Sequence, residues 1–123
     1  MDQNTIISLI KRVVAPIAQK VRLTVSRGVV KLIDDSLKCQ ELQISLLADE
    51  VADNVERFQE YGFTSVPSAN AEAIVLSVGG SRAHPVAICV TDREKRPLNL
   101  SEGDVCLYTA DGERVYIEKS TDH

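Results

Sequence analysis

The sequence predicts a mostly-β domain, a small barrel or sandwich, that follows one short N-terminal helix. Near the N-terminus, apolar residues recur every three or four positions, as they do on one face of a helix. Beyond about residue 20 the spacing changes to two, which is typical of half-buried strands. Five or six short apolar runs with glycine and proline turns follow within about 75 residues, as in small barrels and sandwiches.

The composition is that of one ordinary globular domain. The chain has 123 residues, of which 44% are hydrophobic and 26% charged, so it can bury a core and is not expected to be disordered. The net charge of −4 argues against a nucleic-acid partner, because neutralising phosphates needs a basic face. Its apolar runs are too short for a transmembrane helix, and an acid precedes the first of them, so we expect no secretory signal.

The helix is expected over residues 5–15, in an N-terminal segment that spans residues 1–19. Asn4 is the expected N-cap, and Pro16 is expected to end or kink the helix. Its apolar stripe consists of Ile6, Ile10, Val13 and Ile17. Two interpretations of this stripe stay open: it packs on the rest of the same chain, or it docks onto a partner.

The strands of the barrel are expected within residues 20–97. Gly28 is expected to form a bulge or tight bend, and residues 49–54 to form a loop or short helical turn. Turns are expected at 34–36, 67–70 and 79–82. By alternation or apolar content, the expected strands are 20–26, 29–33, 41–47, 55–63, 73–78 and 86–91.

A charged linker over residues 92–99 leads into the last segment, residues 98–123, which contains a hairpin. Asp111-Gly112 separates the runs 104–107 and 113–118, and this dipeptide is a strong hairpin signal. The hairpin has few residues of its own chain to pack against, and an isolated two-stranded hairpin is marginal in water. It is therefore expected to project from the barrel and to need neighbours.

No motif indicates catalysis, a metal or a cofactor. His84 precedes a proline in a turn without a local nucleophile or carboxylate, so it is expected to be a surface residue. Cys39, Cys89 and Cys106 are widely spaced and form no CxxC motif. They are expected to be reduced thiols of a protein made in a reducing cytoplasm.

Three of the five aromatic residues lie close together in the sequence: Phe58, Tyr61 and Phe63. They are expected to brace the barrel or a contact between barrels. The alternative is a stacking platform for sugars or bases. The nearby Glu56 and Glu60 make a phosphate backbone an unfavourable ligand for such a platform.

Four motifs carry a resemblance to a known family. They are RFQEYGFTSVP at 57–67, VGGSRAH at 78–84, TDREKRP at 91–97 and EGDVCLYTADGERV at 102–115. Together they resemble the Mu-type baseplate assembly protein V, or tail-spike, family of contractile phage tails. The similarity runs from about Val21 to Glu118, which is nearly the whole chain.

The resemblance implies a homotrimer without enzymatic activity or a cofactor. It implies an OB-type barrel that sits in the baseplate hub of the virion and continues into a three-chain β-helical shaft. On sheath contraction, this spike is driven through the host outer membrane. The candidate trimer contacts are Leu107, Tyr108, Val115, Tyr116 and Ile117, and the candidate hub contacts are Ile6, Ile10, Val13 and Ile17.

One feature of the family is not matched. Family tips commonly hold iron on three copies of a His-x-His motif, whereas this sequence has only a lone terminal His123. The piercing tip and its metal are therefore expected to be absent. The competing function is a monomeric OB-type module for an oligosaccharide or single-stranded nucleic acid, which Phe58→Ala or Tyr61→Ala would inactivate.

Overall fold

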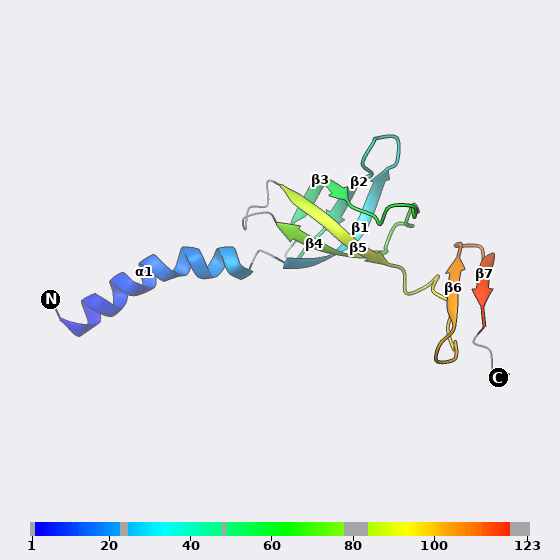
Figure 1. The fold of residues 1–123 in the computed structure, drawn as a ribbon. Helices are drawn as coiled ribbons and strands as arrows, with labels where there is room; N and C mark the ends of the chain where they lie inside the picture. The colour runs from blue at the N-terminus through cyan, green and yellow to red at the C-terminus, as the bar shows by residue number, and fades with distance from the viewer. Residues whose placement is uncertain (1, 23–24, 48, 78–83, 119–123) are drawn as a thin grey trace.

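The computed structural model describes residues 2–22, 25–47, 49–77 and 84–118. Figure 1 shows three parts along the chain: an N-terminal helix, a closed β-barrel and a separate C-terminal hairpin. The two termini lie at opposite ends of this view. The predicted architecture, mostly β with one N-terminal helix and a small OB-like barrel, is confirmed.

Helix α1 (Gln3–Arg22) is longer than predicted at both ends. Asp2, and not Asn4, caps it: its Oδ1 accepts a hydrogen bond of 2.7 Å from the Thr5 N–H, one of the unpaired donors of the first turn. Pro16 lies inside the helix, where its missing N–H removes one helical hydrogen bond, and the helix curves along its length (Figure 1).

The strand predicted over 20–26 is wrong at its start, because residues 20–22 are helical. The local pattern fits both periods: Val21 follows Ile17 by four residues, as on a helix, and alternates with polar neighbours, as on a strand. Helix formation continues because extending an existing helix adds one hydrogen bond for each residue that it orders.

Five strands close the barrel in the order β1-β2-β3-β5-β4, which excludes the sandwich. Neighbouring strands are antiparallel except β3 and β5, which are parallel. The strands are β1 (Val25–Asp34), β2 (Glu41–Ser45), β3 (Val51–Arg57), β4 (Glu72–Ser77) and β5 (Pro85–Thr91).

Strand β3 corrects two predictions, because it covers most of the expected 49–54 loop and ends six residues before Phe63. Its pairing with β2 is irregular: Leu42 lies opposite Val55, and Ile44 lies opposite Ala52. Two residues of β3 therefore oppose one residue of β2, and Asn54 has a φ of 55°. Such a bulge shifts the twofold alternation by one position, which hides the strand from a search for periodicity.

The core lies inside the barrel. Its buried side chains come from all five strands and the turn before β4: Val30, Leu42, Ile44, Val55, Ala71, Ala73, Val75 and Ala87. Gly28 faces this core, and a Cβ added there would lie 2.3 Å from Ile44 Cγ2 and 2.9 Å from the Ser45 carbonyl oxygen. Gly28 therefore allows close approach of β2, and the bulge of β1 comes later, between Val30 and Leu32.

The turns at 34–36 and 67–70 are confirmed. Asp34 Oδ1 accepts hydrogen bonds from the Ser36 N–H (3.0 Å) and hydroxyl (2.6 Å), and these bonds lower the pKa of Asp34. Asn70 adopts a φ of 77° before β4 begins. The predicted 79–82 turn lies outside the described residues, but the strands that it joins pair antiparallel as expected.

Strands β6 (Val105–Tyr108) and β7 (Arg114–Ile117) form the predicted hairpin, a two-stranded antiparallel sheet separate from the barrel. Gly112 has a φ of 90°, as glycine permits in this turn. The Thr109 N–H donates to the Glu113 carbonyl at 2.8 Å and closes the hairpin.

Candidate functional site

The hairpin exposes one wholly aliphatic face. Val105 pairs with Ile117, and Leu107 pairs with Val115, so these four side chains lie on the same side of the sheet. Each is between 55% and 61% exposed. We call this set the aliphatic face. A two-stranded sheet with such a face is not stable alone in water, so the face is expected to be covered by another surface.

The opposite face of the hairpin is polar and carries its own contacts. It consists of Cys106, Tyr108, Arg114 and Tyr116. The Tyr116 hydroxyl donates to Asp104 Oδ2 at 2.6 Å, which raises the pKa of Tyr116. The Arg114 guanidinium carbon lies 5.6 Å from the centroid of the same ring. The five candidate trimer contacts are therefore divided: Leu107, Val115 and Ile117 lie on the aliphatic face, whereas Tyr108 and Tyr116 do not.

The stripe of α1 is exposed as well. Every described side chain from Asp2 to Ile17 is exposed to solvent, and the four predicted stripe residues are between 45% and 67% exposed. The interpretation that this stripe packs on its own chain is therefore wrong for the described residues. The other interpretation, docking onto a partner, stays open. No helix in the described ranges is long and apolar enough to cross a membrane.

The aromatic residues lie on a loop, residues 58–67, that follows β3. Phe58, Tyr61 and Phe63 are 60%, 100% and 63% exposed, and none belongs to the core cluster. They do not pack the interior of their own barrel. A contact between barrels, the other half of the expectation, stays a prediction.

A half-buried arginine holds this loop in place. Arg57 Nη1 donates to the Ser65 carbonyl (2.8 Å) and to Gln40 Oε1 (3.1 Å), and Nη2 donates to the Ser65 hydroxyl (3.1 Å). Gln40 is buried and donates from Nε2 to Asp35 Oδ1 (2.8 Å) and to the Ser65 carbonyl (3.0 Å). Burial lowers the pKa of Arg57. A loop fixed in this way loses little conformational entropy when it meets a partner.

Sequence reasoning missed this network. Gln40 and Ser65 are 17 and 8 residues from Arg57. Neither the spacing of apolar residues nor the turn residues predict that these three side chains meet. A buried glutamine next to a barrel strand is the only local signal, and it becomes visible only when burial is known.

Replacing Arg57 with alanine is expected to release the 58–67 loop and to lower the free energy of unfolding by about 1–3 kcal/mol, because the buried Gln40 loses its donor. Chemical denaturation gives the stability, and hydrogen exchange of the loop amides gives the local effect. Lys31→Ala is the matched control, since Lys31 is exposed and lies on another strand. Equal hydrogen-exchange rates of the loop amides in both variants would show that Arg57 does not hold the loop in place.

An open cleft of about 960 Å³ runs between the aromatic loop, β5 and the hairpin. Its apolar lining includes Phe58, Phe63, Ile88, Leu107 and Tyr108. The free thiols of Cys89 and Cys106 lie at its wall. Within the ranges that the structure describes, no group of three or more histidine, cysteine, aspartate or glutamate side chains is placed to hold a metal ion.

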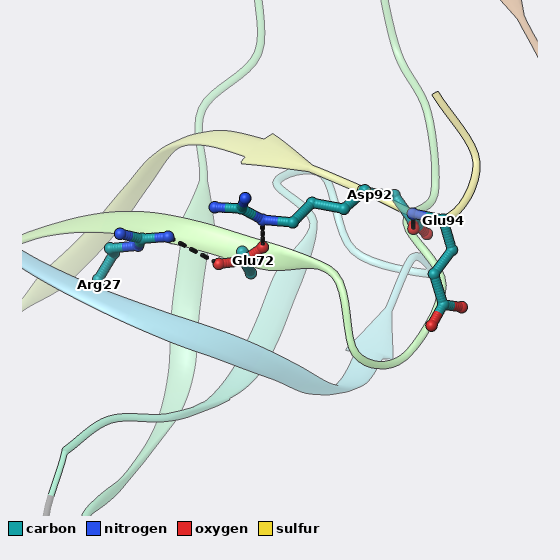
Figure 2. A network of polar contacts seen from close by, with 5 residues as sticks. Arg27, Glu72, Asp92 and Glu94 are labelled. Carbon is teal, nitrogen blue, oxygen red and sulfur yellow. Dashed lines mark hydrogen bonds and ion pairs between the residues drawn. The ribbon is translucent and has the colours of Figure 1, made fainter. Parts of the chain in front are cut away.

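Where the chain leaves the barrel, Glu72 joins two arginines (Figure 2). Its Oε1 accepts from Arg27 Nη2 of β1 at 2.9 Å, and its Oε2 accepts from Arg93 Nε, in the turn after β5. Asp92 Oδ1 closes that turn by accepting from the Glu94 N–H at 3.0 Å. The network links the exit of the barrel to β1 and β4. The hydrogen bonds from Arg93 and Arg27 lower the pKa of Glu72.

This depressed pKa predicts a pH dependence. A carboxyl whose pKa is lowered in the folded state stabilises the fold above its ordinary value of 4.5, and the contribution is lost as the pH falls through the folded pKa. The stability difference between the unchanged chain and Glu72→Gln is therefore expected to be constant near neutral pH and to shrink under acid. Urea denaturation at about pH 7 and about pH 3 measures it. An equal difference at both values would contradict the prediction.

Comparison with known proteins places these surfaces in context. The family described as Bacteriophage Mu Gp45, N-terminal, matches residues 27–94, which include most of the barrel. The Mu-like prophage FluMu protein gp45 of Haemophilus influenzae is 47% identical over 111 residues, or 90% of this chain. The baseplate puncturing device gp45 of Escherichia phage Mu is 44% identical over 112 residues, or 91%. The matches span only 60% and 57% of these two relatives.

Proposed function

Because this chain belongs to the Bacteriophage Mu Gp45 family, we propose that it is a structural part of a contractile phage tail baseplate. Its role is that of the central spike, which sheath contraction drives through the host outer membrane. The name of the phage Mu relative, baseplate puncturing device, supports this role. Synthesis takes place in the host cytoplasm, and the protein then becomes part of the tail.

The observation that carries the proposal is the uncovered aliphatic face of the β6–β7 hairpin. Three chains around one axis, each turning this face inward, would bury all four of its side chains and leave the polar Tyr116 face outside. The segment with the β6–β7 hairpin then begins a trimeric β-helical shaft, and strands β1 to β5 form the barrel at its base. Of the predicted trimer contacts, Leu107, Val115 and Ile117 turn inward in this arrangement, together with Val105.

The other two surfaces fit the same assembly. The aromatic loop of Phe58, Tyr61 and Phe63 is held rigidly and exposed, as a contact between neighbouring barrels requires. The helix lies at the opposite end of the chain from the hairpin (Figure 1). It is our candidate for the end of the spike that meets the baseplate hub.

The proposed action is mechanical and not enzymatic. A closed barrel has no free strand edge, so force can pass through it without exposing strands that pair with other chains. The Glu72 network and the Arg57 network both tie segments next to the barrel to its strands. Free energy released by the sheath is then delivered along a stiff axis to the membrane.

The exposed aromatic loop is also the one observation that favours the alternative, a monomeric module that binds a glycan or single-stranded nucleic acid. This alternative predicts binding to an oligosaccharide or oligonucleotide panel that Tyr61→Ala abolishes. The spike predicts no such binding by the trimer.

A chimaera tests the proposed function directly. The segment of the phage Mu relative that matches this chain is replaced with the present residues, and the remainder of the relative is kept. Infectious particles with the chimaeric protein in their tails are expected, as judged by plaque counts and by antibody labelling of purified tails. A folded chimaera that never enters tails would overturn the proposal.

A further inference from the structure

The stripe of α1 has the spacing of a coiled-coil seam. Ile6, Ile10, Val13 and Ile17 are separated by four, three and four residues, so they alternate between the two core positions of a heptad. All four are β-branched. β-Branched residues at both core positions favour three or four strands over two. The seam ends at Ile17, because Lys20, the next residue in the spacing, is charged.

The apolar face is wider than a two-helix seam. Ile7, Leu9 and Val14 flank the core positions and are also exposed. A pair of helices covers little beyond the core positions, whereas a third helix also approaches the flanks. The width of the face therefore indicates more than two helices.

From this pattern we infer that three copies of α1 associate in parallel as a three-helix bundle with Ile6, Ile10, Val13 and Ile17 at its centre. The inference rests on the proposed trimer, since threefold symmetry gives the three helices the same direction. It changes the role of these four residues from contacts with the hub to contacts with one another, and the flanking Ile7, Leu9 and Val14 pack at the edges of the same bundle.

The charged residues of α1 lie where they do not oppose the packing of identical helices. Lys11 and Arg12 follow the seam residue Ile10 by one and two positions, which places them on the outer side of a bundle. Like charges of neighbouring copies therefore do not meet inside it. The seam itself, from Ile6 to Ile17, carries no charge that would oppose an identical helix.

The short seam explains why the bundle needs the rest of the trimer. From Ile6 to Ile17 the seam spans fewer than two heptads, whereas a coiled coil usually sustains its pattern over about three or four. The hairpins are expected to hold the three chains together, which raises the effective concentration of the helices.

Cysteine cross-linking in the full chain tests the bundle. Ile10→Cys places a thiol in the seam, Val13→Cys repeats the test at the second core position, and Ser8→Cys is the control on the outer face. Under mild oxidation, both seam variants are expected to give several-fold more covalent dimer than Ser8→Cys on non-reducing gels. The unchanged chain measures the background from its three native cysteines.

Light scattering on the same samples separates the two proposals. A trimer with strong cross-linking at both seam positions supports the bundle. A trimer in which the seam variants cross-link no more than Ser8→Cys overturns the bundle but not the proposed function. A monomer overturns the trimer, and with it the bundle.

Discussion

Replacing Val115 with aspartate is expected to convert the trimer into monomers while the barrel stays folded. Val115 pairs with Leu107 on the aliphatic face, so threefold symmetry brings three carboxylates together in an apolar interface. An uncompensated buried charge costs about 3–5 kcal/mol, and here three of them also repel one another. The barrel is expected to persist because the hairpin contributes no side chain to its core.

Arg114→Asp is the matched control. Arg114 precedes Val115 on β7 and lies on the opposite, polar face, so its substitution changes the charge of the same strand without entering the proposed interface. Native mass spectrometry gives the oligomeric state, and circular dichroism gives the fold. A Val115→Asp variant that remains trimeric would show that the aliphatic face is not the contact.

Replacing Gly28 with valine is expected to lower the free energy of unfolding of the barrel by about 3 kcal/mol or more. The new Cβ would meet Ile44 Cγ2, Leu46 Cδ2 and the Ser45 carbonyl oxygen at 2.3, 2.9 and 2.9 Å. The Ile44 and Leu46 side chains could turn away, but the carbonyl belongs to strand β2. It can move only if the β1–β2 pairing moves with it. Whole domains are stable by only about 5–15 kcal/mol, so a loss of this size is large.

Lys31→Val is the control for this prediction, because Lys31 lies on the same strand with an exposed side chain. It is expected to change stability by no more than about 0.5 kcal/mol. Urea denaturation of both variants provides the comparison. If Gly28→Val unfolds at the same urea concentration as the unchanged chain, the close approach of β2 at this point is not a constraint.

The elements that the sequence predicted well are those with a local cause. Alternation placed Leu42 and Ile44 on one face, and both are buried. Asp111-Gly112 forms the turn of the predicted hairpin because its glycine reaches a positive φ. The family resemblance found in four motifs is confirmed. The family model matches residues 27–94, which include the first two motifs and most of the third.

The failures arise where the local pattern is ambiguous or interrupted, or where distant residues decide the structure. The bulge next to Asn54 interrupts the alternation that identifies a strand. Residues 20–22 fit both the helical and the strand spacing of apolar residues. The aromatic loop was expected in part as barrel packing, because large aromatic side chains are usually buried, yet Phe58, Tyr61 and Phe63 are exposed. Their exposure depends on where the Arg57 network holds the loop, which involves residues far apart in the chain.

In the hairpin, the sequence predicts the two strands, whereas only the pairing of the strands shows which side chains share a face. Alternation on β6 and β7 left open which side chains share a face. The pairing of Leu107 with Val115 and of Val105 with Ile117 decides this. Turn and strand propensities act within a few residues, whereas the choice of face depends on the register between two strands.

The oligomeric state is the central claim, and the solution mass measures it most directly. Size-exclusion chromatography with light scattering, over a wide range of concentrations, is expected to give the mass of three chains of 13.5 kDa each. A species that remains at the mass of one chain up to about 1 mM, a concentration at which even a weak one-to-one contact of about −4 kcal/mol forms, would contradict the trimer. The spike assembly built on it would then be untenable.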